Sequence, residues 1–190
     1  MTTARDEGTT RVRATEVLAD GFSRVRDDVH ALLTGDARTG MGPESGVTPE
    51  QLTHRIDGGS NTIAWLLWHL TRVQDDHVSE LAGHDQVWTS AGWAQRFALP
   101  FADTETGFGQ GPEQVEQVQP SADLLRGYFD AVHERTAAFL ADLSDDDLDR
   151  VVDERWDPPV TLGVRLLSVI GDDLQHAAQA AYVLGVAQRA

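Results

Sequence analysis

Apolar residues recur at steps of three and four along four long stretches of the chain, which is the repeat of an amphipathic helix. These stretches contain no proline, a residue that breaks the interior of a helix. The pattern predicts helices over about residues 10–33, 61–81, 121–143 and 161–186. The apolar face of the first helix comprises Val12, Val17, Leu18, Phe22, Val25, Val29 and Leu32.

The ends of the predicted helices carry residues that favour capping or termination. Gly35 and Gly83 follow the first two helices, at the position where a left-handed residue commonly ends a helix. Either Ser60 or Asn61 is expected to cap the start of the second helix, and Ser121 the start of the third. These signals agree with the boundaries that the apolar pattern predicts.

Two long connections separate the first three helices. Residues 34–59 include TPEQL at 48–52, which predicts a short helical turn, and residues 84–120 form a longer connection. A loop of that length inside a compact domain usually has a function or covers another part of the protein. Four aromatic residues of the longer connection could line a cavity: Trp88, Trp93, Phe97 and Phe101.

Two short motifs lie between the long helices. GFGQG at 107–111 is rich in glycine, but no predicted strand precedes it, so it is not expected to bind phosphate. SDDDLDR at 144–150 is typical of a capped short helix, because it lacks the glycine and the terminal glutamate of an EF-hand loop. No segment is predicted to be a strand.

Together these elements predict an all-α fold, a four-helix bundle with long crossover connections. A chain of 190 residues is expected to form a single domain, residues 1–190. Bundles of this kind build sites in their core from polar side chains on facing helices.

Composition and charge narrow the possible functions. The chain has no cysteine, so a disulfide framework, a thiolate nucleophile and a cysteine-based zinc site are excluded. Its net charge of −16 would repel a phosphate backbone, so nucleic acid is not an expected partner. The first residues lack the apolar core of a signal peptide, and no apolar run approaches the roughly 20 residues that span a bilayer. A cytoplasmic protein without a membrane partner is expected.

Candidate metal ligands lie on the second and fourth helices. Asp172 and His176 are four residues apart, so one helix face presents both side chains to a common point. Asp173 is an alternative ligand. His69 sits among apolar and aromatic residues, where a lone histidine is more often a packing residue than a ligand. Beside the pair on the fourth helix it would complete a site with two histidines and one carboxylate.

Three protein ligands with open positions are typical of a catalytic zinc site, and the same set suits nickel, iron or manganese. Asp76, like Asp75, is predicted to be a solvated residue near the end of its helix, or to orient a ligand. The remaining histidines outside these helix faces are predicted to be surface or packing residues: His30, His54, His84 and His133.

With His69 and DDLQHAAQ identified, nearly the whole sequence resembles the DinB superfamily of metal-binding four-helix bundles. The pattern of that superfamily is a histidine in the second helix, followed by HxxxHxxQ or ExxxH in the last. In this chain His69 lies in WHLTRV, and the last-helix positions fall on Asp172, His176 and Gln179. The aspartate departs from the pattern, and whether Asp172 or Asp173 is the ligand stays open.

The resemblance implies a divalent metal, zinc first, and a low-molecular-weight thiol such as mycothiol as cosubstrate. The implied activity is that of an S-transferase or a thiol-assisted isomerase acting on an electrophilic substrate. Arg72 and Arg165 are then candidates for binding an anionic group near the metal, unless they are ordinary surface residues, and Gln179 is a further substrate-binding candidate. The alternatives are a metal-dependent hydrolase and a non-catalytic bundle that binds a small ligand or a partner. Either a monomer or a homodimer is compatible with the sequence.

Overall fold

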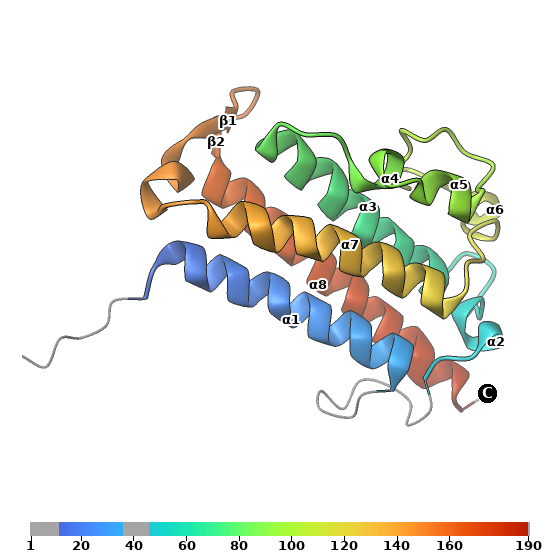
Figure 1. Ribbon diagram of the computed structural model, residues 1–190. Helices are drawn as coiled ribbons and strands as arrows, with labels where there is room; N and C mark the ends of the chain where they lie inside the picture. Colours follow the sequence, from blue (N-terminus) through green and yellow to red (C-terminus); the bar gives the residue numbers. More distant parts are fainter. Residues whose placement is uncertain (1–11, 36–45, 190) are drawn as a thin grey trace, which may run out of the picture.

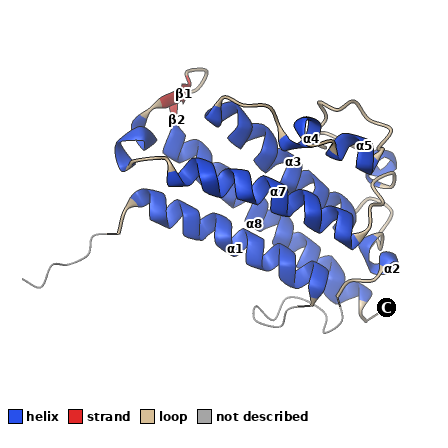
Figure 2. Ribbon diagram, viewed as in Figure 1, coloured by secondary structure: helices blue, strands red, loops and turns tan. Residues whose placement is uncertain are grey.

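The computed structural model describes residues 12–35 and 46–189, and its architecture is a bundle of four long helices (Figure 1). Almost all of the regular structure in this part of the chain is helical (Figure 2). The predicted all-α bundle is therefore confirmed, and each long helix lies close to its predicted range. The four are α1 (Ala14–Thr34), α3 (Ile63–Ala82), α7 (Ala122–Ala141) and α8 (Leu162–Ala187).

Most of the predicted helix ends are also observed. Gly35 and Gly83 adopt left-handed conformations with φ of 79° and 71°, and they end α1 and α3. Ser121 caps α7, since its side chain accepts a hydrogen bond from the backbone N–H of Leu124. The predicted cap of α3 is wrong by one or two residues, because the Oγ1 of Thr62 accepts the N–H of Trp65 instead.

The directions of the helices explain the longer of the two connections. α3 packs against α7 and α8, and α1 packs against the same two helices. In Figure 1 α1 and α8 run in one direction, whereas α3 and α7 run in the other. The link from α3 to α7 must therefore return along the whole bundle, which for a helix of 20 residues is about 30 Å.

Short elements occupy the connections. The predicted turns at TPEQL and SDDDLDR are observed, the second as a 3₁₀ helix. A two-stranded antiparallel hairpin that was not predicted precedes α8, with Val151 opposite Thr161. Its strands are too short to show an alternating pattern in the sequence. These elements are α2 (Pro49–Leu52), α4 (Val87–Ser90), α5 (Trp93–Phe97), α6 (Pro112–Val115), η1 (Asp145–Asp149), β1 (Val151–Asp153) and β2 (Val160–Thr161).

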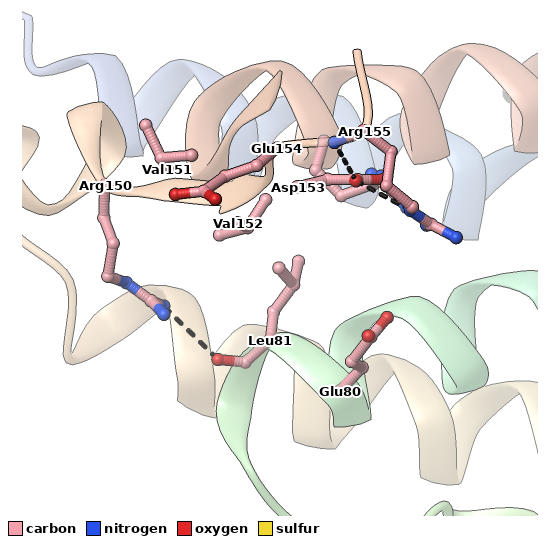
Figure 3. A pocket seen from close by; sticks show the side chains of 9 residues that line it. Glu80, Leu81, Arg150, Val151, Val152, Asp153, Glu154 and Arg155 are labelled. Atoms are coloured by element: carbon pink, nitrogen blue, oxygen red, sulfur yellow. Dashed lines mark hydrogen bonds and ion pairs between the residues drawn. The ribbon is translucent and has the colours of Figure 1, made fainter. Parts of the chain in front are cut away.

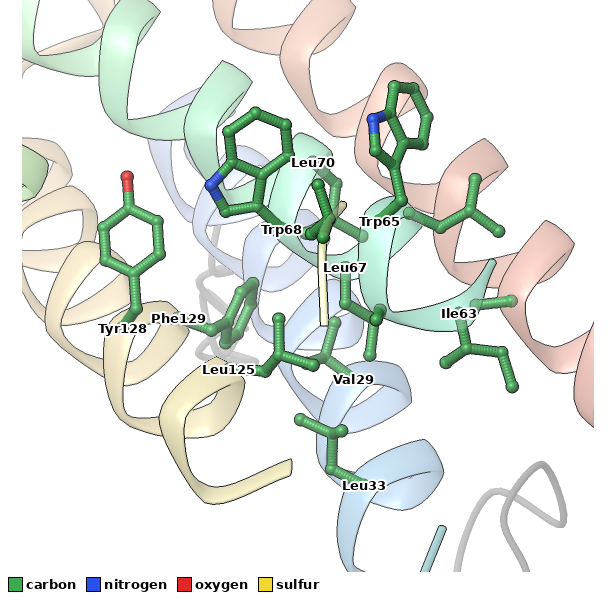
Figure 4. Packing of buried hydrophobic residues seen from close by; sticks show 14 of the residues in the cluster. Val29, Leu33, Ile63, Trp65, Leu67, Trp68, Leu70, Leu125, Tyr128 and Phe129 are labelled. Carbon is green, nitrogen blue, oxygen red and sulfur yellow. The ribbon is translucent and has the colours of Figure 1, made fainter. Parts of the chain in front are cut away.

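The core is built mainly from one face of each long helix. Figure 4 shows Trp68 and Leu67 of α3 facing Leu125 and Phe129 of α7, with Val29 of α1 beside Leu125. Four aromatic residues of the 84–120 connection pack into or against this core: Trp88, Trp93, Phe97 and Phe101. Trp88 lies 5.1 Å, between ring centroids, from both Phe97 and Tyr128. They therefore extend the core over α3 and α7.

Two residues of the predicted apolar face of α1 do not belong to it. Val12 and Val17 are 65% and 61% exposed, whereas Phe22 and Val25 are buried. Val12 precedes the first turn of the helix, and Val17 directly precedes Leu18, which takes the inward position. No helix in the described ranges is long and apolar enough to cross a membrane.

Candidate metal centre

His69 lies on the buried face of α3 with its ring fixed on two sides. Its side chain is only slightly exposed, and it stacks on Trp65 of the preceding turn, with ring centroids 4.6 Å apart. Its Nδ1 lies 2.6 Å from the backbone oxygen of Thr106. Because a carbonyl oxygen can only accept, Nδ1 must carry the proton, and Nε2 keeps its lone pair.

Asp172 and His176 lie one turn apart on α8. The Oδ1 of Asp172 is 3.7 Å from the Nε2 of His176, which is too long for a hydrogen bond. On its other side, the Nδ1 of His176 lies 3.2 Å from the Oε1 of Gln179. The Oε1 of Gln179 can thus accept a hydrogen bond from Nδ1–H, which leaves the Nε2 of His176 as the ring nitrogen on the side of the carboxylate.

The antiparallel packing of α3 against α8 brings these side chains together. One ligand atom each from His69, Asp172 and His176 lies within 4.8 Å of the others. The rings of His69 and His176 meet edge to face, with centroids 4.8 Å apart. The Oδ2 of Asp172 is buried and has no hydrogen-bond partner among the described residues. Two imidazoles and a carboxylate with uncommitted acceptor atoms are a donor set that fits a divalent metal ion.

Burial also affects the protonation of His69. The burial of the ring lowers the pKa of His69, and the nearby His176 lowers it further, although the Thr106 carbonyl and Asp172 oppose this shift. A lowered pKa keeps the imidazole neutral at pH 7, and neutral imidazole is the form that ligates metal ions. The environment of His69 therefore favours the form that a metal site requires.

Asp173, the alternative ligand, is not part of this group. It is completely buried, and neither carboxylate oxygen has a hydrogen-bond partner within residues 12–35 and 46–189. Burial raises the pKa of Asp173 well above its usual range, and the neighbouring Asp172 raises it further. The structure brings Asp172, and not Asp173, to the two histidines.

Asp76 and Asp75 have different surroundings. Asp76 accepts a hydrogen bond of 2.6 Å from Gln86 and is outside the His69 group. The expectation that Asp75 is solvated is wrong, because it is 2% exposed. Its carboxylate accepts the backbone N–H groups of Val87 and Trp88 and the hydroxyl of Tyr128. Burial and Asp75 raise the pKa of Tyr128, which keeps the phenol protonated as a donor.

Arg72 is not a surface residue either. Its side chain is fully buried one turn beyond His69, and its guanidinium donates to the backbone oxygens of Glu105 and Asp103 and to the Oε1 of Gln86. The guanidinium also lies over the ring of Trp88, 4.9 Å from the centroid. Arg72 therefore anchors the 84–120 connection on α3.

Arg165 lies at the hairpin end of the bundle. It donates to the Oδ2 of Asp153 at 3.0 Å, and its Nη1 lies 3.3 Å from the Nδ1 of His77. It also lines a cavity of about 620 Å³, whose walls include Arg150, Asp153 and Glu80 (Figure 3). From Asp172 to Arg165 is seven residues, about 10 Å along the helix axis. Arg165 thus belongs to a neighbouring cavity on the same pair of helices.

The pattern of the sequence did not predict the part played by residues 105–110. Thr106 reaches His69 through its backbone oxygen, which no side-chain motif can signal. Gly107 has a φ of +97°, and a Cβ on it would lie 2.9 Å from the Nδ1 of His69. The glycine-rich GFGQG was the available signal. Its first glycine lets the backbone approach His69 closely.

Comparisons with known proteins identify the family and support the fold. A family model described as the DinB superfamily matches residues 22–180. A crystal structure of a conserved protein from Enterococcus faecalis is similar, with a TM-score of 0.79 and 27% sequence identity, over 92% of this chain and 96% of that one. No curated protein is significantly similar to the chain.

Proposed function

Because the chain belongs to the DinB superfamily, whose members bind metal ions, we propose that it is a metal-dependent enzyme with a low-molecular-weight thiol as cosubstrate. A thiol of the mycothiol type would serve in S-transfer to, or isomerisation of, an electrophilic substrate. The observation that carries the proposal is the convergence of His69, Asp172 and His176, with ligand atoms within 4.8 Å of one another.

In this proposal the three side chains hold a divalent ion, with zinc as the first candidate. Three protein ligands leave a position open for a small molecule, which is typical of catalytic sites rather than structural ones. The contacts of Thr106 and Gln179 with the two Nδ1 atoms support the assignment, because such contacts fix the ring orientation of ligating histidines.

The thiol must come from outside, because the chain has no cysteine. A divalent ion in the site would lower the pKa of a bound thiol, so that the nucleophilic thiolate is available at neutral pH. The residues of the chain supply the surroundings. Trp65 stacks flat on His69 and excludes water from that side of the ring, and its indole lies nearly perpendicular to the ring of His176, with centroids 6.4 Å apart.

Room for a substrate exists beside the candidate ligands. A cavity of about 480 Å³ lies between the start of α3 and the second half of α8, and Gln179, which contacts His176, is part of its wall. Leu66, Tyr182 and Val183 make much of that wall apolar. Its size suits a small organic substrate. The cavity that Arg165 lines is at the other end of the α3–α8 pair, and its wall contains polar groups such as Arg150 and Asp153.

The test begins with metal analysis of protein purified without a metal-chelating tag. We expect near-stoichiometric zinc or another divalent metal in the native protein, and none in the double variant His69→Ala/His176→Ala. His54→Ala is the matched control, because His54 lies outside the group of candidate ligands. A native protein that contains no metal, even after incubation with zinc, nickel or manganese, would contradict the proposed site.

The second step is a screen of electrophiles with and without added mycothiol or another small thiol. We expect turnover by the metal-loaded native protein that requires the thiol and is lost in the double variant. Turnover of esters or amides without any thiol would identify a metal-dependent hydrolase instead. Metal binding without turnover in either screen would favour a non-catalytic binding protein.

A further inference from the structure

His69 is oriented by a loop as well as by its own helix. Residues 103–110, called the strap below, cross α3 beside the ring, and the Thr106 carbonyl of the strap lies 2.6 Å from Nδ1. That carbonyl keeps the proton on Nδ1 and so leaves the lone pair on Nε2, the nitrogen that remains for a metal ion shared with Asp172 and His176. Whatever fixes the strap thus controls the ligand atom of His69.

Arg72 fixes the strap at its first half. Its Nε and Nη2 donate to the backbone oxygens of Glu105 and Asp103 at 3.1 and 3.2 Å, directly before Thr106. The guanidinium is itself held from behind, with Nη1 3.4 Å from the hydroxyl of Tyr128 and 3.7 Å from the carboxylate of Asp75. The Arg72 guanidinium is fully buried and makes several hydrogen bonds, so it has little freedom to move and supports the strap rigidly.

Gln110 fixes the strap at its other end. Its Oε1 accepts a hydrogen bond from the Nε1 of Trp65, and its Nε2 donates to the carboxylate of Glu105, both at 2.9 Å. Trp65 is the residue that stacks on His69, with an angle of 18° between the rings. Gln110 therefore connects the carbonyl side of the strap to the indole that sets the plane of the imidazole.

Gly107 allows the strap to approach this closely. A Cβ at this position would lie 2.9 Å from both the Nδ1 of His69 and the Cζ3 of Trp68. The φ of +97° is also one that residues with a side chain rarely adopt. Any larger residue must push the strap, and the Thr106 carbonyl with it, away from the histidine.

We propose that Arg72, Gln110 and Gly107 are positioning residues for the ligand His69, acting through the strap. They hold the Thr106 carbonyl on Nδ1, which fixes the Nδ1–H tautomer and presents the lone pair of Nε2 to the metal site. This inference rests on the proposed metal site. It differs from a purely structural role, in which the same contacts would support the fold but leave the tautomer of His69 unchanged.

The test compares the metal-free native protein with Gln110→Ala, Gly107→Ala and Arg72→Lys. Long-range ¹H–¹⁵N spectra of protein labelled in histidine report the tautomer of each ring. We expect a single Nδ1–H tautomer for His69 in the native protein and a mixture of tautomers in the variants. Zinc affinity, measured by competition with a chelator dye, should fall about 10- to 100-fold, as for other residues that orient a ligating histidine.

The matched control is Arg96→Ala in the same 84–120 connection. Arg96 lies over the ring of Trp93, 4.3 Å from its centroid, and is exposed. It should leave both the tautomer and the zinc affinity as in the native protein. Gln110 is only half-buried, so Gln110→Ala decides the question even if Arg72→Lys does not fold.

Two results would overturn the inference. One is an Nε2–H tautomer of His69 in the native protein. The other is a Gln110→Ala variant and a Gly107→Ala variant that keep both the native tautomer and the native zinc affinity. If the native protein binds no zinc, the proposed metal function fails, but the tautomer spectra of the metal-free proteins still decide the role of the strap.

Discussion

Within residues 12–35 and 46–189 the bundle contains two histidine–aspartate pairs, and their difference shows what distinguishes a structural contact from a candidate ligand set. His30 of α1 and Asp130 of α7 make a direct contact of 2.6 Å between Nε2 and Oδ1. His176 and Asp172 of α8 stand 3.7 Å apart, and His69 faces them from α3. The residue types are the same, but the first pair satisfies itself and the second leaves its acceptor atoms free.

The reason for the difference lies in what holds the other nitrogen of each ring. In the second group both Nδ1 atoms have partners, the Thr106 carbonyl and the Gln179 amide, so both Nε2 atoms remain uncommitted. In the first pair Nε2 itself is used by Asp130. Four predictions test this comparison, beginning with the largest expected effect.

Replacing His176 by alanine should weaken zinc binding by at least about 100-fold, beyond the loss that follows removal of a residue that merely orients a ligand. Replacing His30 by alanine should leave zinc affinity as it is in the native protein. Isothermal titration calorimetry with a competing chelator measures both. Equal losses of zinc affinity in the two variants would contradict the distinction between a ligand pair and a structural pair.

Replacing Asp172 by asparagine should lower zinc affinity about tenfold or more, because an amide oxygen carries no charge for the cation. Asp173→Asn is the matched variant, and it should leave zinc affinity unchanged, because the amide resembles the protonated carboxyl that burial favours there. The same titration separates the two positions. The opposite result would make Asp173 the ligand.

Replacing Asp130 by alanine in the metal-free protein should lower the free energy of unfolding by about 0.5–1 kcal/mol, since the lost contact is partly exposed. Asp172→Ala should lower the free energy of unfolding by less than this, or should raise it, because Asp172 makes no close hydrogen bond with His176. Urea denaturation followed by circular dichroism gives both values. A larger loss for Asp172→Ala would mean that its pair also stabilises the fold.

The smallest expected effect concerns His133, which lies one turn after Asp130. Burial, with a contribution from Arg26, lowers the pKa of His133 below its usual range. The unfolded chain then binds more protons than the folded one near that range, so stability should decrease as the pH falls from about 6.5 through the lowered pKa. His133→Leu should flatten that decrease in thermal melts recorded from pH 7.5 to pH 5. If thermal stability decreases with falling pH as steeply in His133→Leu as in the native protein, groups other than His133 cause the decrease.

Much of the fold was predictable because its signals are local. The repeat of apolar residues located all four long helices, and Gly35, Gly83 and Ser121 marked ends that the structure confirms. The Asp172/His176 spacing places two side chains on one face of any helix, so their proximity was also a local property. The hairpin at Val151 was missed because its strands are only three and two residues long.

The surroundings of the candidate site were decided by the tertiary structure alone. Arg72 and Asp75 have the sequence appearance of exposed helix residues, yet the 84–120 connection covers them and satisfies their hydrogen bonds. The four-residue spacing to His176 favoured Asp172 but left Asp173 as an alternative, since the direction of each side chain depends on how α8 is rotated against α3. The sequence by itself determined which helices form and which polar residues they carry. Only the packing determined which of those residues meet, because contacts between distant segments depend on helix rotation and on the path of the loops.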